Sequence, residues 1–169
     1  MAGKLVELNL RNVRGNADKT MTYLKGQIPA EAQKRGDKGF TVVFLGETHG
    51  NAIDQAVAKA VLTNPPLTTD ATKMCAILER QLEDVYETSL SHFFDMQGLK
   101  KEGIDLAAGR LARSIKIAQA IMDLAECGDK TLFYVVFGSA HGKEIFDALQ
   151  KSTLNFTFLL KMDNDTYST

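Results

Sequence analysis

The sequence has little cysteine, little net charge and no long hydrophobic run, and each absence excludes a class of protein. Only 2 of the 169 residues are cysteine, which argues against a disulfide framework and for reduced thiols at Cys75 and Cys127. A formal net charge of −1 gives no reason to expect nucleic acid or an anionic membrane as a partner. No apolar run approaches the length of a transmembrane span.

Targeting signals and nucleotide-binding motifs are missing as well. No apolar segment follows Met1–Lys4, so no signal peptide is expected; a cytoplasmic location is favoured, and export by a specialised secretion system is left open. The chain lacks Gly-x-Gly-x-x-Gly, the P-loop pattern and Gly-x-Ser-x-Gly, which leaves nucleotide binding and serine-hydrolase chemistry without support. A content of 44% hydrophobic and 24% charged residues is typical of one soluble globular domain, here spanning residues 1–169.

Short apolar runs separated by helical patterns predict the fold. Four runs rich in β-branched and aromatic residues are expected to be strands, and a weaker edge strand is expected near the start of the chain. In chain order, these segments are Lys4–Leu10, Phe40–Leu45, Met74–Leu78, Leu132–Phe137 and Phe156–Lys161. Because strands and helices alternate at this spacing, we expect an α/β fold, with a mainly parallel sheet of four to five strands flanked by helices in three layers.

Several helices are predicted from their boundaries and apolar stripes. Two short helices are expected at Asp18–Lys25 and Pro29–Arg35, because proline suits a first helical position. Longer helices are expected over Gln81–Met96 and Ile104–Cys127. The predicted buried stripe of the Ile104–Cys127 helix consists of Ile104, Ala108, Leu111, Ile115, Ala118, Met122 and Ala125.

One short pattern occurs twice: a glycine ends an apolar run, and a histidine follows three residues later. The two copies are Gly46–His49 and Gly138–His141. Each copy follows a predicted strand and precedes a predicted helix, which is capped by Asn51 in the first case and covers Lys143–Lys151 in the second. Open parallel sheets place ligand sites outside the carboxyl ends of their strands. We therefore expect His49 and His141 at the edge of the sheet where chemistry occurs.

Acidic residues accompany these histidines. Glu47 and His49 are two residues apart, so in an extended segment both side chains point to the same side. Glu79 and Arg80 directly follow a third predicted strand. Taken alone, each motif reads as a charged loop, a helix cap or a Glu–Arg pair that begins a helix. Taken together, and with His141, they predict one shared site.

The residue types in this site suit hydrolysis. His49, oriented by Glu47, is expected to act as a general base on water or as a metal ligand. Glu79 and His141 then complete the coordination of the metal or share the protons of the reaction. Two histidines and two carboxylates suit zinc, manganese or iron(II), and a reaction without metal is also open.

Two neighbouring residues are expected to contact the substrate. Arg80 lies beside Glu79, where it can orient the carboxylate or bind an anionic group. Ser139 is small and lies next to a strand-end histidine, which suggests that a ligand approaches closely there. The expected substrate is a small molecule or a peptide, with neither nucleic acid nor membrane as a partner; a homodimer is left open.

The order of these motifs resembles the erythromycin esterase/ChaN-like superfamily, from Leu-Gly-Glu-x-His after the first core strand to Gly-x-x-His after a later one. The paired Gly-x-x-His motifs also resemble the TraB/Tiki group of metal-dependent proteases. The resemblance covers about Phe40 to Gly142 and implies an α/β fold with its site at these strand ends. It implies the following working residues: Glu47, His49, Glu79 and His141.

This resemblance leaves three functions open. Some members of the superfamily look like hydrolases, others bind haem or iron, and a related domain occurs within bacterial toxins. A hydrolase is the first expectation. The chain has little room for the helices that cap the substrate cleft in longer members, which favours the alternative of a metal- or haem-binding protein without turnover. A secreted effector or toxin-like domain is the third reading.

Overall fold

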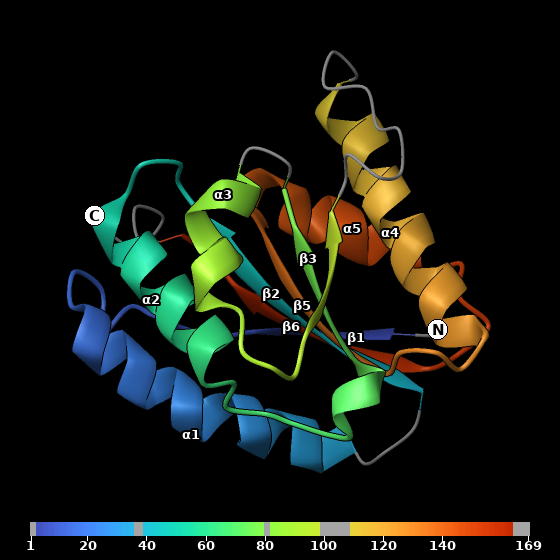
Figure 1. The fold of residues 1–169 in the computed structure, drawn as a ribbon, viewed down its shortest axis with the longest axis horizontal. Coiled ribbons are helices and arrows are strands. Elements are labelled where there is room, and N and C mark those ends of the chain that lie inside the picture. Colours follow the sequence, from blue (N-terminus) through green and yellow to red (C-terminus); the bar gives the residue numbers. More distant parts are fainter. Residues whose placement is uncertain (1–2, 36–38, 80–81, 99–108, 164–169) are drawn as a thin grey trace.

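In the part of the chain that the structure describes, six parallel strands form one central sheet (Figure 1). The computed structural model describes residues 3–35, 39–79, 82–98 and 109–163. The strands are β1 (Gly3–Glu7), β2 (Phe40–Glu47), β3 (Met74–Leu78), β4 (Asp95–Gly98), β5 (Leu132–Gly138) and β6 (Phe156–Lys161). Their order is β1-β6-β2-β5-β3-β4, and every neighbouring pair is parallel. The predicted α/β class with a parallel sheet is confirmed, and β4 adds a strand that the sequence did not predict.

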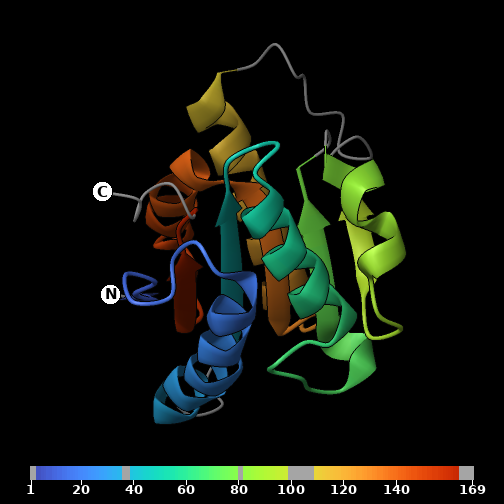
Figure 2. The same cartoon turned by 90° about the vertical axis from the view of Figure 1, so that its left-hand side faces the viewer.

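Helices cover both faces of the sheet and make three layers (Figures 1 and 2). The helices are α1 (Ala17–Arg35), α2 (Ala52–Thr63), α3 (Glu83–Tyr86), α4 (Arg110–Glu126) and α5 (Gly142–Leu149). Successive residues of a strand point to opposite faces, so strands buried on both faces are apolar throughout. Phe44 of β2 packs in the core under α4 and α5, and its neighbour Val43 packs in the core under α1, α2 and α3.

Helix α1 runs through Pro29, where the sequence predicts a boundary between two helices. That prediction is wrong. Leu24 and Ile28 lie on one stripe of α1 and are both fully buried against the sheet. A proline inside a helix removes one backbone hydrogen bond at a cost of about 3 kcal/mol. Burial of two large side chains on a common face, at about 1.5–3 kcal/mol each, offsets this cost.

The prediction of one helix over Gln81–Met96 is also wrong for most of this segment. The structure has the short helix α3, a 3-10 turn at Glu87–Ser89, and then strand β4. Strand β4 pairs with the open edge of β3, from Cys75 to Leu78. Local helical spacing is a weak preference, and pairing with a strand far away in the sequence outweighs it.

Helix α4 turns a different face to the core from the one predicted. Ala118, Met122 and Ala125 are buried as expected, whereas Leu111 and Ile115 are 56% and 48% exposed. The buried face consists of Ser114, Ile117, Ala118, Ile121, Met122 and Ala125. Leu111 and Ile115 lie on the face of α4 that is turned to solvent, whereas Ser114 and Ile117 on the opposite face are fully buried. Ile104 and Ala108 lie outside the described residues.

Candidate active site at the carboxyl edge of the sheet

Strand order brings the two Gly-x-x-His motifs and the third acidic strand end together. Strand β5 lies between β2 and β3, with Glu47 opposite Gly138 in the β2–β5 ladder and Leu78 opposite Val136 in the β3–β5 ladder. All three strands are parallel, so their carboxyl ends meet at one edge. The residues that follow them form a single cluster of hydrogen bonds and ion pairs: Glu47, His49, Glu79 and His141.

His49 lies between two carboxylates. Its Nδ1 is 2.7 Å from Oε1 of Glu47, and its Nε2 is 3.1 Å from Oε2 of Glu79. The His49 side chain is 45% exposed, whereas those of Glu47 and Glu79 are only 1% and 5% exposed. His49 is therefore the member of the cluster that a molecule in solution can reach, and two buried acids fix its ring.

A tyrosine that the sequence did not single out holds Glu47 from behind. The hydroxyl of Tyr86, at the end of α3, donates a hydrogen bond to Oε2 of Glu47. Tyr86 is fully buried. Burial first, and then the hydrogen bond to Glu47, raises the pKa of Tyr86 far above its ordinary value of 10.0, so the phenol keeps its proton and remains a donor. One oxygen of Glu47 thus faces Tyr86 and the other faces His49.

His141 has a different environment from His49. Its Nε2 lies 3.6 Å from Oε1 of Glu79, and its Nδ1 lies 2.7 Å from Oγ of Ser114. The Ser114 hydroxyl also donates a hydrogen bond to Oε1 of Glu144. His141 is only 4% exposed, and burial lowers its pKa below the ordinary 6.5, against the opposing effect of Glu79. The cluster therefore contains a reachable imidazole and a buried one whose neutral form is favoured.

Gly138 forms the floor between these side chains. Its backbone N–H donates a hydrogen bond to Oε1 of Glu79 at 3.3 Å. A Cβ atom placed on Gly138 would lie 3.8 Å from Oε1 of Glu79, 3.8 Å from Cδ2 of His141 and 3.9 Å from Nε2 of His49. The glycine of this motif therefore leaves a small space that all three reactive groups border.

A buried ion pair supports the first motif from below. Nζ of Lys161, at the end of β6, donates to the carbonyl oxygen of Gly46 at 2.8 Å and lies 3.4 Å from Oδ1 of Asp54. The other carboxylate oxygen of Asp54 accepts from the N–H of Thr48 at 3.0 Å. Burial lowers the pKa of Lys161, and Asp54 opposes that shift. These contacts fix the turn that carries Glu47 and His49.

The second motif is tied to the same strand end. Oγ of Ser139 accepts a hydrogen bond from the backbone N–H of Asp163, just beyond β6, at 2.7 Å. A Cβ on Gly46 would lie 2.5 Å from this Oγ, so the two motifs are in close contact. Ser139 thus joins the turns of the site, and contact with substrate stays a prediction. Arg80, the other predicted substrate contact, lies outside the described residues.

Metal binding by this cluster stays a prediction. Within residues 3–35, 39–79, 82–98 and 109–163, no three histidine, cysteine, aspartate or glutamate side chains are arranged to hold an ion. Glu47 has one oxygen facing His49 and the other facing Tyr86. Coordination of zinc, manganese or iron, and binding of haem, are left to experiment.

The comparisons with known proteins identify no relative of this chain. A scan against family profiles, a search of curated proteins and a search of solved structures each find no match to this chain. The resemblance to the erythromycin esterase/ChaN-like and TraB/Tiki groups therefore stays a prediction. Within the part of the chain that the structure describes, no helix combines the length and the apolar character needed to cross a bilayer.

The variant Gly138→Ala tests whether the space beside His49 matters for activity without a large change in stability. Gly138 has φ −52° and ψ 139°, which alanine adopts without strain, and the added methyl group makes only ordinary contacts. We expect a free energy of unfolding within about 0.5–1 kcal/mol of the parent protein. We also expect at least a tenfold loss of any ester hydrolysis that the cluster catalyses, because the methyl group occupies the space beside His49.

The matched control is Gly142→Ala. There a Cβ would lie 2.7 Å from Leu160 and 3.2 Å from Phe44, both in the core. Overpacking of this kind costs about 1–3 kcal/mol. Urea unfolding and an ester-hydrolysis assay on both variants check the prediction. Full activity in Gly138→Ala would show that no reacting molecule uses this space.

The lowered pKa of His141 predicts that acid destabilises the protein. In the folded state this imidazole takes up a proton at lower pH than in the unfolded chain. Below the unfolded pKa of about 6.5, the unfolded state therefore binds the extra proton, and the free energy of unfolding falls as the pH falls. Urea titrations from pH 8 to 5 should show a shallower slope for His141→Gln than for His92→Gln, which changes an exposed histidine. Equal slopes would contradict the prediction.

Proposed function

We propose that this protein is a hydrolase in which His49 activates water against a small-molecule or peptide substrate. The single observation that carries the proposal is the position of His49, a reachable imidazole held between two buried carboxylates at the carboxyl edge of a parallel sheet. Contacts on both nitrogens hold the ring in one orientation, and a general base has to be positioned in this way. The resemblance in motif order supports the same choice.

The contacts suggest how the proton moves. With hydrogen on Nδ1, His49 donates to Glu47, and Nε2 accepts a proton from a water that takes the place of its 3.1 Å contact with Glu79. The water oxygen bonds to the carbonyl carbon of the substrate, the bond to the leaving group breaks, and the imidazolium returns the proton to that group. Glu79, 3.1 Å from Nε2, stabilises the imidazolium while it holds the proton.

Each supporting residue then has a defined task. Tyr86 and Glu47 keep the ring in one orientation, as an orienting acid does for a catalytic histidine. His141 is buried beside Glu79, with its Nε2 3.6 Å from the second carboxylate oxygen, and it limits the positions that this carboxylate can take. Lys161 and Asp54 keep the turn of the first motif in place.

The second candidate is a metal-binding protein without turnover. It is favoured by one observation: Nε2 of His49 and Nε2 of His141 face the two oxygens of the same carboxylate, Glu79. Imidazole nitrogen with carboxylate oxygen is a donor set that zinc, manganese and iron(II) accept. A divalent ion held there would lower the pKa of the water bound to it.

One experiment separates the two candidates. The purified protein is assayed with p-nitrophenyl acetate, p-nitrophenyl butyrate and a peptide p-nitroanilide, before and after dialysis against EDTA, with metal content and the absorption spectrum recorded. Hydrolysis that survives chelation and disappears in His49→Ala supports the hydrolase without metal, and hydrolysis restored by one metal supports its metal-assisted form. Stoichiometric metal without turnover supports the second candidate. Neither turnover nor bound metal would refute both.

A further inference from the structure

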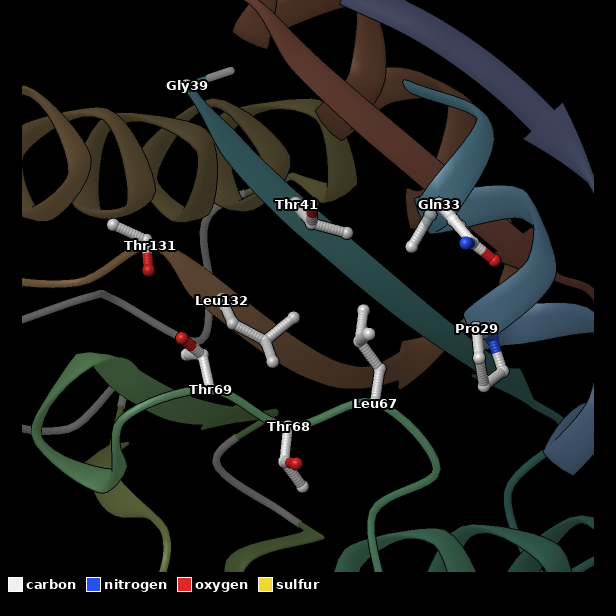
Figure 3. A pocket seen from close by; sticks show the side chains of 10 residues that line it. Pro29, Gln33, Gly39, Thr41, Leu67, Thr68, Thr69, Thr131 and Leu132 are labelled. Atoms are coloured by element: carbon white, nitrogen blue, oxygen red, sulfur yellow. The ribbon is translucent and has the colours of Figure 1, made fainter. Parts of the chain in front are cut away.

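A cavity of about 510 Å³ lies at the amino edge of the sheet, the edge opposite the histidines (Figure 3). Its floor is formed by the starts of β2 and β5, one wall by the last turns of α1, and the other wall by the loop that carries Leu67, Thr68 and Thr69. Small-molecule sites have volumes of about 300–1,000 Å³. The cavity shares no lining residue with the histidine cluster, so its ligand is independent of the proposed hydrolysis.

Unused hydrogen-bonding groups surround this cavity. Four threonines line it: Thr41, Thr68, Thr69 and Thr131. None of their hydroxyls, nor the amide of Gln33, has a hydrogen-bond partner among the described residues. Each hydroxyl can donate one hydrogen bond and accept two. The cavity thus offers a ring of donors and acceptors that the protein itself does not use.

The backbone that carries these groups is fixed. The N–H of Thr41 donates to the carbonyl of Thr131, whose own N–H donates to the carbonyl of Lys73, each at 2.9 Å. The buried hydroxyl of Tyr134 accepts from the N–H of Leu67 at 3.0 Å and donates to its carbonyl at 2.7 Å. These bonds hold both sides of the cavity in place before any ligand enters, which lowers the entropy cost of binding.

We propose that this cavity binds an uncharged small molecule with an apolar body and peripheral hydroxyl or carbonyl oxygens. Leu67 and Leu132 extend toward each other across it, which suits an apolar body (Figure 3). The surrounding hydroxyls and the amide of Gln33 suit neutral oxygens. Among the residues that the structure describes, no charged side chain lines the cavity. A charged ligand would lose hydration there without gaining a counter-charge, which is costly.

Three probes with the same ring test the charge preference. Cyclohexane-1,4-diol is neutral, cyclohexylammonium is cationic and cyclohexanecarboxylate is anionic. Each is titrated into the ¹⁵N-labelled protein and followed through the backbone amide resonances. We expect the diol to shift the amides of residues 39–41, 67–69 and 131–132 in a saturable way, and the charged probes to bind at least tenfold more weakly. Absence of a saturable shift with the diol, or equal binding of all three, overturns the proposal.

Two variants test the role of the hydroxyls. Thr41→Val and Thr131→Val keep the shape of the side chain, and each is expected to weaken binding of the diol about fivefold through one lost hydrogen bond. Thr153→Val changes an exposed threonine that does not line the cavity and is the control. Amide spectra unchanged elsewhere show that the variants fold. Diol affinity equal in all three variants and the parent would show that these hydroxyls bind nothing.

Discussion

Replacing His49 with alanine is expected to lower the rate of nitrophenyl ester hydrolysis by a factor of roughly 100 to 10,000, the usual contribution of a positioned base. The free energy of unfolding should change by no more than about 1 kcal/mol, because the side chain is half-exposed and lies outside the core. Steady-state kinetics and urea unfolding measure the two quantities. His92→Ala is the control, since His92 is exposed and lies outside the cluster.

Variants behind His49 should give a graded loss. Glu47→Gln keeps the shape of the side chain and removes the charge that faces Nδ1, whereas Tyr86→Phe removes only the hydroxyl that holds Glu47. We expect Glu47→Gln to lose more activity than Tyr86→Phe, because Glu47 contacts the ring directly. Turnover that survives in His49→Ala would contradict the assignment of His49 as the general base. Glu79 and His141 would then be the next candidates for that role.

Replacing Lys161 with methionine is expected to cost about 3–5 kcal/mol of stability, the usual effect of removing one partner from a buried ion pair. Lys161 is only 2% exposed and Asp54 only 1%, so methionine leaves the Asp54 carboxylate buried without the cation that faces it. Removing both charges in Lys161→Met with Asp54→Asn should restore much of the loss. Urea unfolding of the two single variants and the double variant measures the coupling.

The same variants report on the histidine cluster. The carbonyl of Gly46 and the N–H of Thr48 both depend on this pair for a hydrogen bond, so loss of the pair frees the turn that carries His49. If the loss in the free energy of unfolding of the double variant equals the sum of the losses of the two single variants, Lys161 and Asp54 act independently. In that case their support of the turn would have to come from packing alone.

The sequence predicted the strand-end residues well, because the signals are local. A buried parallel strand is an apolar run, and polar residues directly after it lie at the sheet edge whatever the rest of the fold does. The sequence therefore predicts that Glu47, His49, Glu79 and His141 lie together, and the structure shows contacts among them. Their chemical roles are not local properties, and stay proposals.

The supporting residues could not be predicted because each depends on contacts between distant segments. Tyr86 lies 39 residues from Glu47, and Ser114 lies 27 residues from His141. On its own helix Tyr86 looks like an ordinary apolar contact. A lysine at the end of an apolar strand, such as Lys161, was the one available signal, since burial of lysine requires a partner. Strand β4 was missed because its pairing outweighs a local helical pattern.

The position of β5 determines when the cluster can first exist during synthesis. Strands β2 and β3 carry Glu47, His49 and Glu79, yet they do not neighbour each other; β5, from the last quarter of the chain, lies between them. A nascent chain that ends at Glu126 contains three of the four clustered residues but not the strand that brings them together. Strand β1 likewise cannot pair until β6 has been synthesised, because β6 is its only neighbour in the described sheet. The ribosome must therefore release β5 before the cluster can form, and fragments that end before Leu132 should lack it.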